Sequence, residues 1–532
     1  METIGFPETL KGLHIHLVGA KGTGMTALAE ILHNRGALLT GSDVPDVFYT
    51  DSILHSLNVR LFENFDAQHV PADTDLVIYS AAYSREANPE LRAAIQRNIP
   101  VFSYPQALGA LSIHSKSAGI AGVHGKTTTT ALAGILMEAL SMPATVLAGS
   151  AISNFNGRCT LIQGSKYFLA ETCEYRKHFL NFKPSWIVLT SVESDHQDYF
   201  PTYESIRDAF VEYALTLPEG GVLIFCADQK GAVEVADIVL QKRKNIKFVE
   251  YGFSAKGKYR IRDFQTGAGT NTFAVGDAPV PIELHVPGRH LVLDAVAAIA
   301  LADAIFEAET SRTFGAEEWK SIAAALSSFR GSKRRSEIVG EFENILILDD
   351  YGHHPTAIKA TLEGIKKFWP HRRLVVDFMS HTYSRTIALQ DDFVASLDEA
   401  DAVVMHKIYS SARERSVPGF DGRTLFQKLC ERRTDLIPID LGLVSGKGAA
   451  SDQGLAQRPA TPGPNPSGKG GFALYSDEPL DARDRLLENL RPGDIFLTMG
   501  AGDNWKLGKA IADRLRESRT SQPSGKIQEQ QP

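Results

Sequence analysis

The sequence predicts an α/β protein with several domains, each built around a mainly parallel β-sheet. Short apolar runs that have the character of buried strands alternate along the chain with segments of helical periodicity, as in doubly wound folds. The chain has 532 residues, and this length favours about three or four domains because a single hydrophobic core stops growing earlier. Several predicted strands end in glycine-rich or acidic sequence. Ligands of open α/β sheets bind at these carboxyl ends.

Composition excludes several classes of function. The net charge of −7 argues against a non-specific binder of nucleic acid or of membrane surfaces. The four cysteines lie far apart without a C-x-x-C pair, so neither a disulfide framework nor a thiolate zinc site is expected. The start of the sequence lacks the composition of a signal peptide, and no run reaches the roughly 18 apolar residues of a membrane span. We therefore expect a cytoplasmic protein.

The first predicted domain covers residues 1–113 and begins with a strand at 13–19. Gly22 and Gly24 follow in a G-x-x-G-x-G turn, which differs from the dinucleotide fingerprint but still admits a diphosphate to the N-terminus of the next helix. Ser42 and Asp43 come about twenty positions later, where related folds read the polar edge of a nucleotide. Further elements are expected as a helix at 26–35, strands at 37–40, 75–80 and 101–102, and a helix after Asn88 and Pro89.

A second domain, at 114–333, opens with a phosphate loop. Gly122 and Gly125 bound the turn between a predicted strand at 117–123 and a helix at 126–140. Backbone N–H groups and the helix N-terminus bind phosphate in such a turn, while Lys126 reaches the terminal phosphates and Thr127 faces Mg²⁺. Ile120 stands where the full G-x-x-x-x-G-K-[ST] pattern has glycine. An ordinary glycine-containing turn is the alternative.

Two later strands of this domain end in acidic sequence. Glu171 and Glu174 follow the predicted strand 167–171, and Asp195, His196 and Asp198 follow the strand 186–191. Because the carboxyl ends of parallel strands share one edge, we expect both groups to lie near the phosphate loop and to serve Mg²⁺. Taken singly, each residue has the alternative of a solvated loop acid. The remaining elements are expected as a strand at 221–225, short strands within 247–286, and helices at 203–217, 291–306 and 317–328.

The third domain, at 334–532, has predicted strands at 344–350 and 373–378, and strands beginning at 401 and 494 are expected to complete its sheet. Tyr351 and His353 follow the first strand, and His381 and Arg385 follow the second. Adjacent histidines diverge, so we expect substrate contacts rather than zinc, with Arg385 holding a carboxylate bidentately. Arg334 lies in a basic run that is either a linker or a source of positive charge for nucleotide phosphates. Residues 442–471 have the composition of a mobile insertion and 518–532 that of a disordered tail.

Together these motifs resemble the Mur ligases of peptidoglycan synthesis, over nearly the whole chain except the insertion and the tail. The glycine loop with Gly-Ser-Asp makes the chain most similar to members that join L-alanine to UDP-N-acetylmuramate. The motifs that carry the likeness are Gly122-Val-His-Gly-Lys-Thr, Ala170-Glu-Thr-Cys-Glu, Glu193-Ser-Asp-His, Pro287-Gly-Arg-His, Asp349-Asp-Tyr-Gly-His-His-Pro-Thr, His381-Thr-Tyr-Ser-Arg and Met499-Gly-Ala-Gly-Asp.

The resemblance implies a three-domain architecture: a Rossmann-like UDP-binding domain, a central P-loop ATPase domain and a Rossmann-like amino-acid domain. It also implies the reaction, in which the lactyl carboxylate of UDP-N-acetylmuramate attacks the γ-phosphate of ATP. The amine of L-alanine then attacks the acyl phosphate, giving an amide, ADP and phosphate. Since the ATP-side and amino-acid-side residues belong to different domains, we expect closure of the third domain over the second.

By motif, the resemblance also assigns the site residues. The catalytic set is Lys126, His353, His381 and Arg385, and the metal ligands for Mg²⁺ are Thr127, Glu171 and His196. ATP is assigned to Gly122, His124, Gly125, Lys126, Thr127, Thr128, Asp294 and Arg334, with His124 also near the muramyl group. The two substrates are assigned to Gly22, Thr23, Gly24, Ser42, Asp43, Tyr351, His353 and Arg385.

Three positions depart from the family pattern. Leu291 and Asp294 replace two asparagines that usually face adenine, which leaves adenine recognition open. Lys21 stands where glycine is common in the first loop, and a cation near a diphosphate is no obstacle. Thr382 replaces a frequent arginine, which removes one cationic contact.

Other functions remain possible from the sequence. A recycling ligase that adds a preformed tripeptide to UDP-N-acetylmuramate shares most of the motifs, and folylpolyglutamate synthetase shares only the central domain. A non-catalytic nucleotide-binding regulator is a different class, but it has no need for intact Lys126, Glu171, His196 and Arg385. Oligomeric state and the preference among L-alanine, glycine and L-serine are open.

Overall fold

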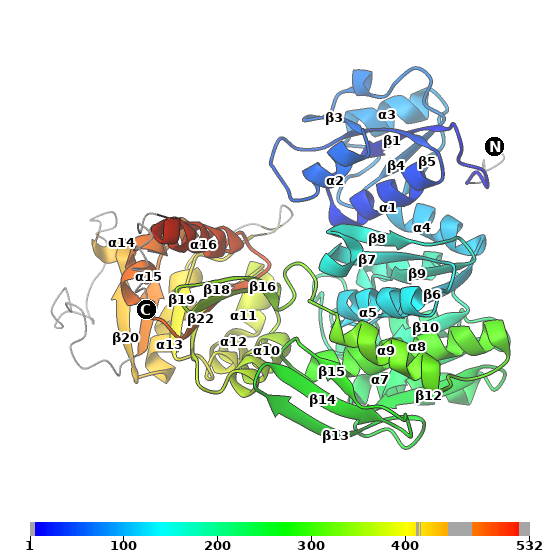
Figure 1. The fold of residues 1–532 in the computed structure, drawn as a ribbon. Coiled ribbons are helices and arrows are strands. Elements are labelled where there is room, and N and C mark those ends of the chain that lie inside the picture. Colours follow the sequence, from blue (N-terminus) through cyan, green and yellow to red (C-terminus); the bar gives the residue numbers. More distant parts are fainter. Residues whose placement is uncertain (1–5, 411–413, 415–416, 445–470, 521–532) are drawn as a thin grey trace, which may run out of the picture. The chain divides into compact units, whose positions relative to one another are not determined.

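The structure is a computed structural model that describes residues 6–410, 414, 417–444 and 471–520. It divides into two compact units, Met1–Gln265 with Thr270–Lys333 and Thr266–Gly269 with Arg334–Pro532. Three β-sheets form the framework (Figure 1). Most of the predicted insertion and tail lies outside the described residues. Of the residues that are described there, 442–444 belong to a short helix, Gly471 opens a strand and the last helix reaches Thr520.

The first sheet is parallel, with the order β3-β2-β1-β4-β5. The strand order reverses at β1, with β2 and β3 on one side and β4 and β5 on the other, so the glycine turn after β1 lies at the topological switch point, where ligands of such sheets bind. Its strands are β1 (His14–Val18), β2 (Leu38–Ser42), β3 (Arg60–Phe62), β4 (Leu76–Tyr79) and β5 (Val101–Ser103). Its helices are α1 (Thr23–Asn34), α2 (Asp51–Ser56), α3 (Pro89–Gln96), α4 (Tyr104–Ile113) and the 3₁₀ turn η1 (Ala67–His69).

The second sheet has ten strands in the order β15-β14-β13-β12-β11-β10-β6-β9-β7-β8. Helix α5, which begins at the phosphate loop, packs against β7 and α8 (Figure 1). The strands are β6 (Lys116–Ala121), β7 (Ala144–Ile152), β8 (Arg158–Ile162), β9 (Tyr167–Glu171), β10 (Trp186–Leu189), β11 (Val222–Cys226), β12 (Lys247–Gly252), β13 (Tyr259–Gly267), β14 (Thr270–Val275) and β15 (Ile282–Leu284). The helices are α5 (Lys126–Ala139), α6 (Tyr203–Ala214), α7 (Lys230–Lys242), α8 (Arg289–Thr310), α9 (Ala316–Ser327) and the 3₁₀ turns η2 (Ser153–Phe155) and η3 (Tyr175–Asn181).

The sequence did not predict β7 and β8, which lie between the phosphate loop and β9. The β7 sequence is rich in alanine and glycine, and its pairing with antiparallel β8 shifts register between Leu147 and Ile152. Glycine within a strand weakens the strand pattern and often marks such an irregularity. This hairpin lies at the edge of the sheet next to β9.

A shared hydrophobic core joins the first two sheets within the first unit. Helix α1 packs on β7 and β8, and its Leu28 and Ile31 belong to the same buried cluster as Leu147 of β7. Polar contacts reinforce the packing: the Glu30 carboxylate accepts hydrogen bonds from the Arg158 guanidinium (3.3 Å) and the backbone N–H of Cys159 (3.1 Å). The hairpin that the sequence did not predict therefore connects the nucleotide-type domain to the phosphate-loop domain.

The second unit is built on a seven-stranded sheet in the order β16-β17-β22-β18-β19-β21-β20, with only β16 antiparallel to its neighbour. The prediction that two strands complete this sheet after 373–378 was wrong, since β16, β20 and β21 also join it. Its strands are β16 (Glu337–Phe342), β17 (Ile345–Asp350), β18 (Arg373–Met379), β19 (Ala402–Met405), β20 (Leu436–Asp440), β21 (Gly471–Tyr475) and β22 (Asp494–Gly500). Its helices are α10 (Pro355–Phe368), α11 (Tyr383–Ala388), α12 (Gln390–Ser396), α13 (Gly422–Arg432), α14 (Leu441–Val444), α15 (Arg483–Asn489), α16 (Trp505–Thr520) and the 3₁₀ turn η4 (Pro479–Ala482).

Within the described part of the chain, no helix combines the length and apolar character that a bilayer span requires.

Candidate active site

The phosphate loop forms the predicted turn between β6 and α5. Gly122 and Gly125 have φ values of 141° and 80°, which L side chains rarely adopt. A Cβ atom at Gly122 would come within 2.0 Å of Thr190 Oγ1. The loop is also bonded to the end of β10, since His124 N–H donates to Ser191 Oγ (2.8 Å). Glycine is therefore needed for conformation and for close approach to the neighbouring strand.

Lys126 points back across the loop toward β9. Its Nζ lies 3.0 Å from Glu174 Oε2 and donates to the Gly122 carbonyl at 2.5 Å. Burial, the largest single cause, lowers the pKa of Lys126, but Glu174, Glu171 and Cys173 together raise that pKa by more, so the net shift is upward. Burial likewise has the largest single effect on Glu174 and raises its pKa, but Lys126 and His196 together hold the pKa of this carboxyl below its usual value. The pair is therefore ionised, and its ammonium lies at the predicted phosphate cradle.

Thr127 and Glu171 lie together, as predicted for a shared magnesium ion. The Thr127 hydroxyl donates to Glu171 Oε2 at 2.7 Å. Glu171 is the last residue of β9, and a Cβ atom at Gly149 on β7 would lie 2.2 Å from the same oxygen. The absence of a side chain at Gly149 thus makes room for the carboxylate.

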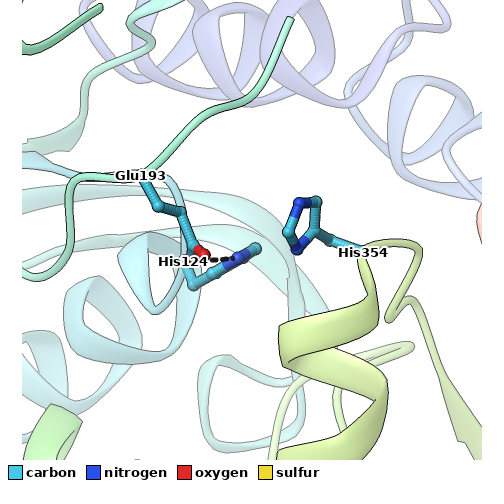
Figure 2. A group of neighbouring side chains, drawn as sticks. All are labelled: His124, Glu193 and His354. Atoms are coloured by element: carbon cyan, nitrogen blue, oxygen red, sulfur yellow. Dashed lines mark ion pairs between the residues drawn. The ribbon is translucent and has the colours of Figure 1, made fainter. Parts of the chain in front are cut away.

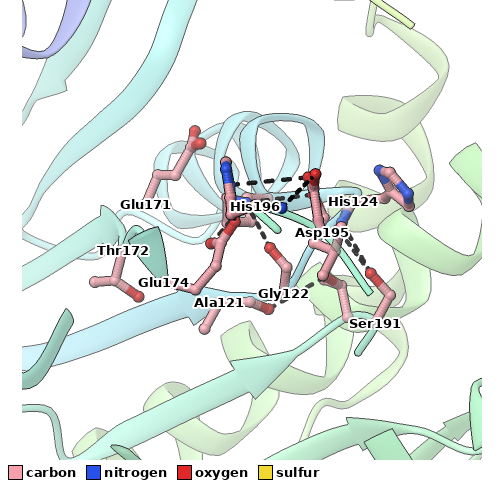
Figure 3. Close-up of polar contacts among 12 residues, drawn as sticks. Ala121, Gly122, His124, Glu171, Thr172, Glu174, Ser191, Asp195 and His196 are labelled. Atoms are coloured by element: carbon pink, nitrogen blue, oxygen red, sulfur yellow. Dashed lines mark hydrogen bonds and ion pairs between the residues drawn. The ribbon is translucent and has the colours of Figure 1, made fainter. Parts of the chain in front are cut away.

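The residues after β10 divide between two roles, and Figure 3 shows two of them, Asp195 and His196, beside Glu174. His196 has a left-handed backbone (φ 54°), and its Nε2 lies 3.3 Å from Glu174 Oε1 and 3.8 Å from Asp195 Oδ2. Asp198 is exposed and accepts a hydrogen bond from Tyr175 Oη at 2.7 Å. Glu174, Asp195 and His196 thus gather beside the loop, whereas Asp198 is a solvated loop acid.

His124, within the loop, forms an ion pair with Glu193 after β10. Its Nε2 lies 2.8 Å from Glu193 Oε1, and Figure 2 shows the carboxylate directed at the ring. Glu193 belongs to the motif Glu193-Ser-Asp-His, but no role of its own was predicted for it. Its place after the carboxyl end of a strand was the signal that could have identified it.

The two residues that replace the family's asparagines on α8 are both buried. Leu291 is apolar and 5% exposed. Asp294 lies against the phosphate loop, because a Cβ atom at Gly125 would come within 2.4 Å of Asp294 Oδ1. A carboxylate at the N-terminus of α5 is favoured by the helix dipole. Thr128, another predicted ATP contact, is buried in the first turn of α5.

The predicted substrate residues of the first domain form the glycine turn and its support. Gly22 caps α1, and Thr23 Oγ1 is hydrogen-bonded to Tyr49 Oη at 2.9 Å. Ser42 and Asp43 are buried at the end of β2, and Asp43 Oδ2 accepts from the backbone N–H of Lys21 at 2.7 Å. The Lys21 ammonium is buried and donates to the Asp46 carbonyl at 2.9 Å.

A cavity of about 170 Å³ lies between the glycine turn and the Glu171 carboxylate within the first unit. Gly24 lies at one side, where a Cβ atom would come within 3.0 Å of the Tyr104 ring. Burial and the nearby Glu171 carboxylate both raise the pKa of Tyr104, which keeps its hydroxyl protonated. The other lining residues include Leu108, Leu147, Cys173, Phe179 and Phe182. Tyr104 and Cys173 were not predicted.

In the second unit, the predicted amino-acid residues lie at the carboxyl ends of β17 and β18. His353 and His381 approach each other with ring centroids 6.1 Å apart, and His353 Nδ1 lies 3.0 Å from the Tyr351 carbonyl. Arg385 is 7% exposed in the first turn of α11. The Glu414 carboxylate accepts from the first backbone N–H groups of α11, those of Tyr383 (2.6 Å) and Ser384 (2.8 Å). His354 caps α10, and its ring accepts from Thr356 N–H.

Arg334 is engaged within the second unit. Its guanidinium pairs with Asp349 (3.2 Å) and donates to the carbonyls of Gly500 (2.7 Å) and Gly502 (3.1 Å). It also lies over the Tyr351 ring, 5.2 Å from the centroid. Burial raises the pKa of Asp349 to about 6, against the opposing effect of Arg334. The basic run is thus tied to the ends of β17 and β22.

A buried polar network in the sheet of the second unit was not predicted. His406 Nε2 lies 2.5 Å from Asp377 Oδ1, and Asn504 donates to Asp377 Oδ2 at 3.0 Å. The three residues come from β18 or follow β19 and β22, three neighbouring strands. The charged residue inside the apolar run of β18 was the available sequence signal.

Comparison with protein families gives three matches along the chain. The Mur ligase family, catalytic domain, matches residues 14–116, and the Mur ligase middle domain matches residues 120–302. The Mur ligase, glutamate ligase domain, matches residues 334–436.

Curated proteins and solved structures that are similar to this chain agree with these family matches. A UDP-N-acetylmuramate--L-alanine ligase of Treponema pallidum is 42% identical over 511 residues, covering 96% of this chain and 98% of that protein. One from Desulfitobacterium hafniense is 37% identical over 502 residues, covering 94% and 99%. The crystal structure of a UDP-N-acetylmuramate-alanine ligase from Thermotoga maritima has a TM-score of 0.72 at 22% identity, covering 95% of this chain and all of that one. A murein peptide ligase from Psychrobacter arcticus has a TM-score of 0.62 at 21% identity.

Proposed function

This chain belongs to the Mur ligase family, and from this premise we propose that it is the ATP-dependent ligase that joins L-alanine to UDP-N-acetylmuramate. The product is an amide of the lactyl carboxylate, a precursor of peptidoglycan. One observation carries the proposal. The identity of 42% to a UDP-N-acetylmuramate--L-alanine ligase extends over 96% of the chain and therefore includes all three sheets.

The domain roles follow the order of the sheets. We propose that residues 1–113 bind the UDP part of the substrate, 114–333 bind ATP, and 334–532 bind the amino acid. Residues 518–532 and most of 442–471 have no role in this proposal. The family membership also supports a cytoplasmic location as part of the proposal.

The phosphate loop has the groups that phosphoryl transfer needs. Such transfer depends on positioning and on charge stabilisation more than on covalent chemistry by the protein. We assign the terminal phosphates of ATP to Lys126, whose ionised side chain is within the loop and able to exchange Glu174 for a phosphate oxygen. Gly122, Gly125 and Thr128 belong to the same cradle. Asp294, against Gly125, is the α8 residue assigned to the ATP side.

The oxygen-rich pair of Thr127 and Glu171 suits Mg²⁺. Magnesium takes oxygen ligands and retains waters and substrate phosphates, so one hydroxyl and one carboxylate 2.7 Å apart fit its requirements. We propose that these two residues and His196 hold the ion. When bound, it offsets negative charge on the phosphates.

The cavity in the first unit is the candidate site for the sugar acid, because it reaches both the glycine turn and the phosphate loop. It extends from Gly24, on the glycine turn, to Glu171, beside the phosphate loop. We propose that the muramyl group occupies it, with its lactyl carboxylate directed toward His124 and Lys126. The buried Tyr104 hydroxyl is a hydrogen-bond donor for this group.

The second unit supplies contacts for L-alanine. An arginine binds a carboxylate with two parallel hydrogen bonds, and we assign the amino-acid carboxylate to Arg385. His353 and His381, whose rings lie 6.1 Å apart, are assigned to the amine and the acyl phosphate. Arg334 and Tyr351 support this region from the ends of β17 and β22.

Phosphate release by the purified full chain tests the proposal. The protein is incubated with Mg²⁺, ATP and UDP-N-acetylmuramate together with L-alanine, L-Ala-D-Glu-diaminopimelate or no amine. We expect release driven by L-alanine and lost in Lys126→Ala. Lys183→Ala is the matched control, because it removes an exposed lysine of the same unit whose ammonium donates to the carbonyl of Leu180.

The other outcomes would contradict the proposal in different ways. Release with the tripeptide alone would identify a recycling ligase. Binding of nucleotide without release under any condition would identify a non-catalytic regulator. Replacing L-alanine with glycine and L-serine in the same assay measures the preference among small amino acids.

A further inference from the structure

We propose that Glu90 is a positioning residue for the loop that holds the UDP part of the substrate, and that Ser42 acts through this loop rather than by touching the nucleotide. The inference rests on the proposed function, because it requires a uridine nucleotide at the glycine turn after β1. Glu90 belongs to no motif described above.

Glu90 is a buried carboxylate surrounded by hydrogen-bond donors. It is 0% exposed. One oxygen, Oε2, accepts from the Ser42 hydroxyl and lies 3.4 Å from His16 Nε2. The other, Oε1, accepts from the Asp66 backbone N–H at 3.3 Å and lies 3.2 Å from His69 Nδ1. A buried carboxylate is stable only when both oxygens are satisfied in this way.

The two histidines extend the network into neighbouring strands. His16 Nδ1 lies 2.8 Å from Thr40 Oγ1 on β2, so a neutral ring can donate from Nε2 to Glu90 and accept from the threonine. The His69 ring stacks on Phe62 of β3 with centroids 4.1 Å apart and planes 4° apart. Glu90 thereby links α3 to β1, β2 and the β3–η1 connection.

Ser42 connects this network to the glycine turn. Its carbonyl accepts from the backbone N–H groups of Gly19 (2.8 Å) and Ala20 (3.1 Å). The next N–H, that of Lys21, donates to Asp43 Oδ2. Three consecutive amides of the turn are therefore held by Ser42 and Asp43.

The Ser42 side chain has no access to a ligand. It is 0% exposed, and its hydroxyl hydrogen is donated to Glu90. If Ser42 affects nucleotide binding, it must do so by setting the position of its own backbone, which holds the glycine turn. Glu90 fixes this position.

Replacing Glu90 with glutamine tests the inference with little change in shape. An amide accepts at one end only, so its NH₂ group faces either the Ser42 side or the Asp66 N–H, where donors already point. We expect the Kd of UDP, measured by calorimetry on the full chain, to rise about tenfold in E90Q and in S42A. A tenfold rise in Kd corresponds to a loss of about 1.4 kcal/mol of binding free energy. In E90Q/S42A the rise should equal that of E90Q alone, because both changes break one link.

Steady-state kinetics separate positioning from general damage. We expect the KM of UDP-N-acetylmuramate to rise in E90Q while kcat at saturation and the KM of L-alanine stay within about twofold, as loss of uniform binding predicts. Glu86→Gln is the matched control, since it makes the same charge change at an exposed position just before α3. It should leave the Kd of UDP unchanged.

An unchanged Kd of UDP in E90Q, or additive effects of E90Q and S42A, would overturn the inference. If E90Q does not fold, His69→Gln replaces it, because this change removes one partner and leaves the carboxylate in place. An unchanged Kd in that variant would also overturn the inference. Failure of the unmodified chain to bind UDP and to release phosphate is a separate result, which would refute the proposed function itself.

Discussion

Replacing Gly125 with alanine tests whether the phosphate loop is shaped by contact with α8 or by backbone conformation alone. Gly125 and Gly157 have similar φ values, 80° and 73°, and both lie in the first unit. A Cβ atom at Gly125 would lie 2.4 Å from Asp294 Oδ1, whereas one at Gly157 meets nothing within 4 Å. Gly157→Ala is therefore a control with the same backbone strain and no steric contact.

The expected costs differ by the steric contribution. An alanine in the left-handed region costs about 1–2 kcal/mol, and this applies to both variants. Displacing the buried Asp294 side chain adds about 1–3 kcal/mol, as overpacking does elsewhere. We therefore expect Gly125→Ala to lower the free energy of unfolding by about 2–5 kcal/mol and to raise the KM of ATP. Gly157→Ala should change the KM of ATP little.

Urea unfolding followed by tryptophan fluorescence measures the stability difference, and phosphate release measures the KM. Asp294→Ala provides the second test, because removing the carboxylate should make Gly125→Ala cost no more than Gly157→Ala. Equal losses of stability in the two glycine variants, or no relief by Asp294→Ala, would refute the reasoning.

Three further predictions concern the second unit. Arg385→Lys should raise the KM of L-alanine at least tenfold and leave the KM of ATP nearly unchanged, since lysine cannot replace a bidentate contact; equal changes in both constants would contradict this. Burial, the largest single cause, lowers the pKa of His406, but Asp377, the Ser476 carbonyl and Asp503 together raise it by more, so the net shift is upward. The stability that His406 adds is thus fully present below its unfolded pKa of 6.5 and is lost as pH rises through the folded pKa. His406→Gln should cost more at pH 6 than at pH 9 in urea unfolding. The pKa of Asp349 is raised from 3.8 to about 6, so its contribution is present below 3.8 and is lost as pH rises through about 6. Asp349→Asn should flatten the stability profile between about pH 4 and pH 7, and an unchanged profile would exclude the carboxyl as its source.

The fold class and the local motifs could be read from the sequence. The strand-to-helix turns at Gly22 and Gly122 can be recognised in the sequence, because glycine, small apolar runs and helical periodicity are local properties. The convergence of Glu171, Glu174 and His196 also followed from the sequence, since parallel strands bring their carboxyl ends to one edge. Elements with weak local patterns, such as β7, β8 and β21, were missed.

Only the tertiary structure decided what each polar side chain contacts. The Ser42 hydroxyl bonds to Glu90, and the Lys21 ammonium bonds to the Asp46 carbonyl. These partners lie 48 and 25 positions away in the chain, and no local pattern encodes such pairs. The sequence by itself determined the family, the fold class and the phosphate loop, because those depend on periodicity and on motif order. Packing determined which carboxylates meet the loop and which support it, because burial forces each polar group to find a partner wherever the fold provides one.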